Sequence, residues 1–163
     1  MNTKLLGALA AAALLTACAS EDTSGAATGA GAAGGTGMMG AGAVRPGSQE
    51  DLVANVGDRV FFALDSSSVG GDQRPTLQRQ AAWLAQYPQV QVSVEGHADE
   101  RGTREYNLAL GQRRANAARD VLVASGVSSQ RLSTISYGKD RPAALGSSED
   151  AWAQNRRAVT VVR

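Results

Sequence analysis

The sequence is poor in the residues that build metal centres and disulfide frameworks. It contains one cysteine and one histidine in 163 residues. A single cysteine excludes an intramolecular disulfide, and a zinc site needs three or four cysteine, histidine or carboxylate ligands. No cofactor-binding motif compensates for this shortage. The sequence therefore indicates neither a metal nor another cofactor.

The chain also has little net charge and few aromatic residues. The formal net charge is +1, and aromatic residues make up 4% of the chain. A nucleic-acid-binding domain needs a surplus of basic residues to neutralise phosphates, so this class of partner is not expected. With so few aromatic residues, the core is predicted to be modest and mainly aliphatic.

Residues 1–18 are typical of an export signal. Lys4 supplies a positive charge, residues 5–15 form an uncharged apolar stretch, and "LTAC" ends it at Cys18. This stretch is too short to span a bilayer, which requires about 20 residues. The cysteine after small residues matches a bacterial lipobox, which implies cleavage before Cys18 and lipidation of its thiol and new amino group. An ordinary signal peptide that happens to contain a cysteine is the alternative.

The residue after Cys18 and the composition that follows suggest a destination and a tether. Ala19 stands where inner-membrane lipoproteins usually carry aspartate, so by resemblance to sorted lipoproteins we expect lipid anchoring in the outer membrane, facing the periplasm. Residues 19–48 are mostly Gly, Ala, Ser and Thr. Such a segment buries little apolar area and is predicted to be a flexible tether with a typical span of about 30 Å. A glycine zipper in a membrane would need apolar residues between the glycines.

Residues 49–163 have the texture of one folded domain. Apolar residues alternate at strand spacing or recur at helical spacing, and turn-forming residues separate the segments. The order β-α-β-α-β-α-β predicts an α/β or α+β fold with a mixed four-stranded sheet packed against helices. We expect strands at 59–64, 90–95, 132–137 and 158–162, and helices at 75–87, 104–125 and 149–155.

Two polar segments follow the first two predicted strands. Asp65 closes the first strand, and the stretch "GHADERGT" at 96–103 closes the second. A connection with a single helix normally joins parallel strands, so both carboxyl ends should lie at the same edge of the sheet. Ligands of open α/β sheets usually bind at this edge. We therefore expect the 96–103 segment to be a ligand-binding loop.

Arg114 is the basic residue expected to complete this site. In an unbroken helix from Thr103 it would lie about 16 Å along the axis from the loop. Glycine inside a helix costs about 1 kcal/mol relative to alanine but is tolerated at a helix start. We therefore predict that the helix breaks at Gly111 and restarts, which would bring Arg114 opposite Asp99.

The charges allow three interpretations. Asp99 and Arg114 could hold the ammonium and carboxylate of a zwitterionic ligand, or they could pair with each other and stabilise the loop. A hydrolase using Asp99 or Glu100 is the third, but no serine or threonine lies in a recognisable nucleophile motif beside His97. The sequence favours a binding protein over an enzyme.

Four segments carry a resemblance to a known family. They are "VFFALD" at 60–65, "VEGHADERGTREYNLALGQRRANAARDVL" at 94–122, "SYGKDRPAALG" at 136–146 and "NRRAVTVV" at 155–162. Together they resemble the OmpA-like domain family, and specifically its peptidoglycan-associated lipoproteins (Pal), over roughly residues 56–163. Small departures are Leu64 for a frequent phenylalanine, Arg104 for a frequent proline, and the pair Ser147-Ser148.

The resemblance implies a function and a site. It implies non-covalent binding of peptidoglycan through the meso-diaminopimelate of the peptide stem, with Asp99 holding the ammonium and Arg114 the carboxylate. It further implies a pocket lined or supported by Leu64, Asp65, Ser66, Asn107 and Leu110. It also implies a TolB-like periplasmic partner within a Tol-Pal system that supports envelope integrity and cell division. A periplasmic protein-interaction module with weak wall binding is the alternative.

The other charged residues receive simpler interpretations. His97 is expected to be a hydrogen-bonded organiser of the loop rather than a ligand or base. Glu100 and Arg101 are expected to be solvated or to belong to a partner surface. Arg156 and Arg157 are expected to form a charged surface where the last strand begins.

Overall fold

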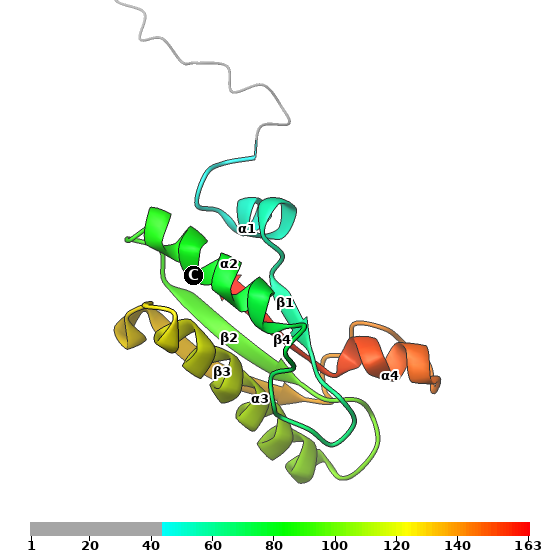
Figure 1. The fold of residues 1–163 in the computed structure, drawn as a ribbon. Coiled ribbons are helices and arrows are strands. Elements are labelled where there is room, and N and C mark those ends of the chain that lie inside the picture. Colours follow the sequence, from blue (N-terminus) through cyan, green and yellow to red (C-terminus); the bar gives the residue numbers. More distant parts are fainter. Residues whose placement is uncertain (1–43) are drawn as a thin grey trace, which may run out of the picture. The chain divides into compact units, whose positions relative to one another are not determined.

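The computed structural model describes residues 44–163, which form a four-stranded sheet with helices around it (Figure 1). The strands are β1 (Arg59–Phe61), β2 (Val92–His97), β3 (Leu132–Gly138) and β4 (Arg157–Val162). The helices are α1 (Gln49–Asn55), α2 (Arg74–Gln86), α3 (Arg104–Ala124) and α4 (Glu149–Asn155), with a 3-10 turn at Ser129–Arg131. The predicted order of strands and helices is confirmed, and α1 precedes it as an element the sequence analysis missed.

The sheet has the order β1-β4-β2-β3. β4 pairs antiparallel with β1 on one side and with β2 on the other, while β2 and β3 are parallel. β1 and β2 therefore run in the same direction, although β4 lies between them. Their carboxyl ends meet at one edge of the sheet, as expected from the single-helix connection between them.

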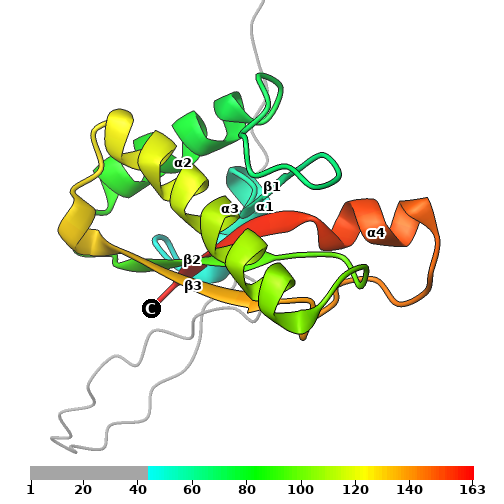
Figure 2. The same ribbon diagram turned by 90° about the horizontal axis from the view of Figure 1, so that it is seen from below.

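Two helices cover one face of the sheet. Figure 2 shows α2 and α3 on the same side of the strands. Apolar residues at helical spacing on α2 and α3 bury against the alternating valines of β2, which is why these segments fold as they do. The resulting core is mainly aliphatic, and its largest fully buried apolar side chains are Leu52, Val60, Leu77, Leu84, Val92, Val94 and Leu122.

The predicted break in the third helix is wrong. α3 runs without interruption from Arg104 to Ala124, and the Thr103 hydroxyl caps it by accepting a hydrogen bond from the Tyr106 N-H. Gly111 lies inside this helix. Glycine suits the position because a larger side chain would press against Ser136 and the backbone of Gly96 on β2. The glycine thus permits close packing of helix on strand and does not mark a helix end.

Several boundaries differ from the predicted ones. β1 ends at Phe61 rather than residue 64, because the chain turns at Ala63–Ser66 and Asp65 adopts a left-handed conformation with φ of 53°. None of the described helices is long and apolar enough to cross a membrane. The predicted signal at 1–18 with Cys18, and the tether at 19–48 up to residue 43, lie outside the described residues.

Candidate functional site

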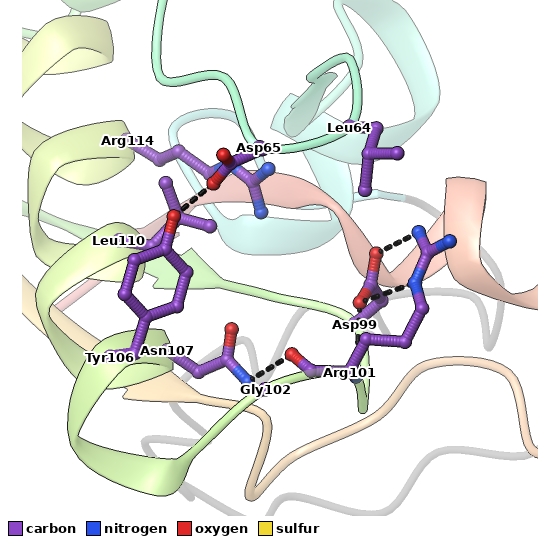
Figure 3. Close-up of a pocket in the computed structure, with 9 residues that line it drawn as sticks. All are labelled: Leu64, Asp65, Asp99, Arg101, Gly102, Tyr106, Asn107, Leu110 and Arg114. Carbon is purple, nitrogen blue, oxygen red and sulfur yellow. Dashed lines mark hydrogen bonds and ion pairs between the residues drawn. The ribbon is translucent and has the colours of Figure 1, made fainter.

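A pocket of about 440 Å³ opens where the loops after β1 and β2 meet the first turns of α3 (Figure 3). Its lining is Leu64, Asp65, Asp99, Arg101, Gly102, Tyr106, Asn107, Leu110 and Arg114. Six of the residues expected at the site therefore line one cavity: all except Ser66. Ser66 contributes through its backbone carbonyl, which accepts a hydrogen bond from Arg114 at 2.8 Å.

Arg114 is fully buried and anchors both loops of the pocket. Its guanidinium donates to three backbone carbonyls, those of Ala63 (3.2 Å), Ser66 (2.8 Å) and His97 (2.9 Å). It reaches them without a helix break because side chains of an α-helix point back toward its N-terminus. Burial lowers the pKa of Arg114 to about 10, so the group is charged at neutral pH.

Asp99 lies at the other side of the pocket and is also buried, with 6% of its surface exposed. Arg101 holds it with a 2.7 Å ion pair, and Arg156 lies 3.5 Å from the same carboxylate oxygen. Burial by itself would raise the pKa of Asp99, but the hydrogen bonds from Arg101 outweigh it and the pKa is lowered. Asp99 is therefore a carboxylate at neutral pH.

Asp99 and Arg114 do not form an ion pair with each other. Asp99 pairs with other arginines, and the Arg114 guanidinium hydrogen-bonds backbone carbonyls. The interpretation in which these two residues pair to stabilise the loop is therefore wrong. They present opposite charges to one cavity, which an ammonium and a carboxylate on the same ligand can match.

The remaining lining residues supply a wall and polar groups. The Tyr106 hydroxyl donates a hydrogen bond to the Asp65 carboxylate across the pocket mouth. The Asn107 amide nitrogen donates to the Arg101 carbonyl at 2.8 Å, and its side-chain oxygen points into the cavity (Figure 3). Leu110 is buried beneath it, whereas Leu64 is more than half exposed. The cavity thus combines an apolar floor with a few fixed polar groups, as ligand pockets do.

Comparisons with known proteins decide the family. The model of the OmpA family matches residues 61–156. The chain belongs to the OmpA family. A peptidoglycan-associated lipoprotein of Mesorhizobium japonicum is 63% identical over 126 residues, which cover 77% of this chain and 75% of the relative. One from Agrobacterium fabrum is 59% identical over 130 residues, covering 80% and 73%.

Solved structures agree with this OmpA-family fold. The crystal structure of the peptidoglycan-associated lipoprotein from Burkholderia pseudomallei matches with a TM-score of 0.65 and 42% identity, covering 69% of this chain and all of that one. The C-terminal domain of Helicobacter pylori MotB matches with a TM-score of 0.60 and 26% identity, covering 65% and 84%. The mixed four-stranded sheet predicted from the sequence is confirmed by the match to the peptidoglycan-associated lipoprotein structure.

His97 contributes to this OmpA-family site through its backbone carbonyl and not through its ring. Its ring is buried, and neither ring nitrogen has a hydrogen-bond partner within residues 44–163. The ring lies 5.6 Å from that of Tyr137, and only the backbone carbonyl of His97 contacts Arg114. Burial, followed by the charges of Arg157 and Arg141, lowers the pKa of His97 to about 4. The ring is therefore neutral at physiological pH.

Two arginines predicted to be on the surface instead belong to the site. Arg101 pairs with Asp99, and Arg156 is buried, donating to the Phe62 carbonyl at 3.0 Å and to Glu149 at 2.7 Å. Arg157 is buried as well and donates to the Arg141 carbonyl. The spacing of Asp99 and Arg101 could have indicated this pairing. An aspartate side chain often accepts a hydrogen bond from the backbone N-H two residues later, which places the two residues side by side.

The described part of the OmpA-family domain offers no metal centre. Within residues 44–163, no three histidine, cysteine, aspartate or glutamate side chains are grouped so that they could hold an ion. The charges of the pocket are balanced by arginines instead. The arrangement is suited to binding a small zwitterion through hydrogen bonds and ion pairs.

Proposed function

We propose that this chain is an outer-membrane lipoprotein that anchors the membrane to peptidoglycan by non-covalent binding of the diaminopimelate in the peptide stem. The observation that carries the proposal is the single cavity lined by Asp99 and Arg114, which are unpaired with each other. The names of its relatives, peptidoglycan-associated lipoproteins, support the same role. Acyl chains on Cys18 would supply the membrane attachment.

The hydrogen-bonding capacity of Arg114 supports the placement of the ligand's carboxylate. A guanidinium has five N-H donors in a rigid fork. Three nitrogens each donate once to a carbonyl, of Ser66, His97 or Ala63. One N-H therefore remains on each terminal nitrogen, and these two can bind a carboxylate. The ligand's ammonium then lies at Asp99, with the side-chain oxygen of Asn107 and the carboxylate of Asp65 as further acceptors.

The features of His97 and Glu100 support a non-enzymatic role. The His97 ring is buried and outside the pocket lining, so it is poorly placed to activate a nucleophile. Glu100 also lies outside the lining, and its carboxylate accepts a hydrogen bond from the Trp152 indole at 3.0 Å. The other carboxylate in the lining, that of Asp65, accepts a hydrogen bond from the Tyr106 hydroxyl. We therefore propose binding without bond cleavage.

The proposal includes membership of a Tol-Pal type system that acts in envelope integrity and cell division. A TolB-like periplasmic protein and other Tol components would then be partners. Leu145, which is 87% exposed on the loop before α4, is an apolar side chain available for such a partner. The alternative is a role mainly in partner docking, with weak wall binding. Pull-down of the partner with and without soluble stem peptide tests it. If the partner and the wall share a surface, the added peptide prevents docking of the partner.

Sedimentation with purified peptidoglycan sacculi tests wall binding. The full-length lipoprotein in detergent is expected to co-sediment, and Asp99→Asn and Arg114→Lys are expected to reduce sedimentation about tenfold or more, because each removes a charge-assisted contact or its bidentate geometry. Arg119 and Asp120 form an exposed pair outside the pocket, so Arg119→Lys and Asp120→Asn are matched controls.

The results are interpreted alongside the melting temperature of each variant. Loss of sedimentation by a variant that is still fully folded at the temperature of the assay supports the assignment. Wild-type sedimentation by both Asp99→Asn and Arg114→Lys shows that the pocket does not bind the wall. Release of soluble fragments from the sacculi would instead support a hydrolase.

A further inference from the structure

Asp99 is already occupied by a cation from its own chain. The Arg101 side chain donates to one Asp99 oxygen through Nε at 3.2 Å and to the other through a terminal nitrogen at 2.7 Å. The backbone N-H of Arg101 adds a third bond at 3.1 Å. The two-point contact uses the carboxylate that a ligand ammonium needs. A ligand ammonium at Asp99 therefore competes with the Arg101 side chain for the same carboxylate.

The Arg101 guanidinium, while it is paired with Asp99, also lies beside an aromatic ring and a carboxylate of α4. Its central carbon is 4.0 Å from the centre of the Trp152 ring, and one terminal nitrogen is 4.0 Å from a Glu149 carboxylate oxygen. Both residues lie on α4, outside the pocket lining. An aromatic face and a carboxylate are both favourable for a guanidinium. A small rotation of the side chain would exchange Asp99 for Glu149.

The backbone of the loop does not depend on this side chain. The Asn107 amide donates to the Arg101 carbonyl at 2.8 Å, and the Lys139 ammonium donates to the carbonyls of Glu100 (3.1 Å) and Gly102 (2.7 Å). These contacts persist if the Arg101 side chain moves or is removed. About one third of the Arg101 side chain is exposed, which leaves it free to rearrange.

Arg156 stays in place and keeps Asp99 charged during the exchange. It is buried and held by the Phe62 carbonyl and by Glu149. Its remaining terminal nitrogen has no hydrogen-bond partner within the described residues and lies 3.5 Å from Asp99. Release of Arg101 therefore leaves Asp99 with one cationic neighbour and space for another.

We propose that Arg101 is an internal competitor for the ligand's ammonium, and that ligand binding moves its guanidinium from Asp99 to Glu149 of α4 while the contact with the Trp152 ring is kept. This inference rests on the proposed function, because it takes the ammonium of diaminopimelate as the displacing group. It assigns Arg101 a specificity role. A ligand without a cationic group leaves Arg101 paired with Asp99. A ligand with an ammonium replaces Arg101 at Asp99, and the displaced guanidinium then strengthens its contact with α4.

Titration of the full-length lipoprotein with free meso-diaminopimelate tests the exchange, with pimelate, the same dicarboxylate without ammonium groups, as the matched probe. Arg101→Ala is expected to bind diaminopimelate about two- to fivefold more tightly than the wild type, the range expected from loss of a partly exposed ion pair. Pimelate binding should stay weak in both proteins. The NMR signal of the Arg101 Nε-H should shift with diaminopimelate and stay unchanged with pimelate.

A second substitution identifies the destination of the side chain. Glu149→Gln is expected to weaken diaminopimelate binding two- to fivefold in the wild-type background, about the value of a partly exposed ion pair, and to have no effect in the Arg101→Ala background. An equal effect in both backgrounds would show that Glu149 acts through Arg156 and would overturn the transfer to α4.

The outcome for Arg101 is separable from that for the pocket itself. Weaker binding by Arg101→Ala would show that Arg101 is a ligand contact and would overturn the competitor role, while the proposed function stands. Unchanged binding by Asp99→Asn would remove the proposed function, whatever Arg101→Ala does. Tighter binding by Arg101→Ala together with loss of binding by Asp99→Asn is the result we expect.

Discussion

Gly96 on β2 and Gly111 in α3 pack backbone against backbone, with no side chain between helix and strand. A side chain added at Gly96 would collide with the Gly111 carbonyl, and one added at Gly111 would meet the Ser136 hydroxyl and approach the Gly96 carbonyl to 2.9 Å. This contact holds the start of the 96–103 loop against the helix that carries Arg114. The position of the pocket therefore depends on two residues that do not line it.

Substitution at these glycines should destabilise the domain in a defined order. Gly96→Ala collides with backbone and is expected to lower the free energy of unfolding by about 3 kcal/mol, at the upper end for overpacking. Gly111→Ala is expected to cost less, about 1 to 2 kcal/mol, because the Ser136 side chain can rotate and alanine favours the helix. Urea unfolding measures both. Gly71→Ala has open space and should be neutral, so a similar loss there would contradict the packing explanation.

His97 should make the stability of the domain depend on pH. Its folded pKa of about 4 lies below the ordinary value of 6.5, because burial and the charges of Arg157 and Arg141 disfavour the protonated ring. Glu95, 3.8 Å away, is the carboxylate facing it. Between these two pKa values the unfolded chain binds the proton and the folded chain does not. Stability is therefore lost as pH falls from about 6.5 toward 4, by about 3 kcal/mol.

His97→Phe isolates this contribution. The substitution keeps a buried ring beside Tyr137 and removes the titratable group. Urea unfolding at pH 7 and pH 4.5 should show a smaller loss of stability for His97→Phe than for the wild type, since the carboxylates titrate in both proteins. Equal losses in the two proteins would show that His97 does not bear the pH dependence.

Asp65 should separate a backbone requirement from a charge requirement. Its φ of 53° is unfavourable for residues with a Cβ and free for glycine. Asp65→Gly and Asp65→Ala both remove the carboxylate that accepts the Tyr106 hydrogen bond. We expect the glycine variant to be about 1 kcal/mol more stable than the alanine variant. Thermal unfolding compares them directly, and a more stable alanine variant would contradict this explanation.

Arg114→Lys should cost stability although it preserves the charge. Three carbonyls, two in the turn after β1 and one at the end of β2, accept hydrogen bonds from the planar guanidinium. A lysine ammonium presents a single nitrogen and cannot reach all three acceptors, so at least one buried carbonyl loses its donor at a cost of about 1 to 3 kcal/mol. Urea unfolding against the Arg119→Lys control measures the loss. A variant as stable as its control would show that the loops hold their shape without Arg114.

The helices and strands of this fold could be predicted from the sequence where the spacing of apolar residues was regular. Alternating valines on β2 and helical spacing on α2 and α3 predicted those segments to within a few residues, because each has one buried face. α1 was missed because its burial depends on tertiary contacts, such as the hydrogen bond from the Trp83 indole to Asp51. Local patterns do not record such distant partners.

The site was predictable in position but not in its pairing. Strand direction placed Asp65 and Asp99 at one edge of the sheet. Arg114 was assigned to the site from an expected helix break, and the resemblance implied the same residue. The helix break failed because propensity was weighed at Gly111 without the strand beneath it. The roles of Arg101 and Arg156 were missed because an arginine on a polar segment looks the same whether it is solvated or paired. Only the three-dimensional position of Asp99 shows that these arginines are paired and not solvated.

The place of β4 in the sheet sets the order in which the domain can be assembled. β4 lies between β1 and β2 in the sheet. It is formed by residues 157–162, which follow every other strand and helix in the sequence. A chain that emerges N-terminus first, from a ribosome or from an export channel, therefore carries unpaired strand edges until its last segment arrives. The pocket edge, shared by β1 and β2, is completed in the same late step, so a partly emerged chain has no preformed site with which to engage a ligand.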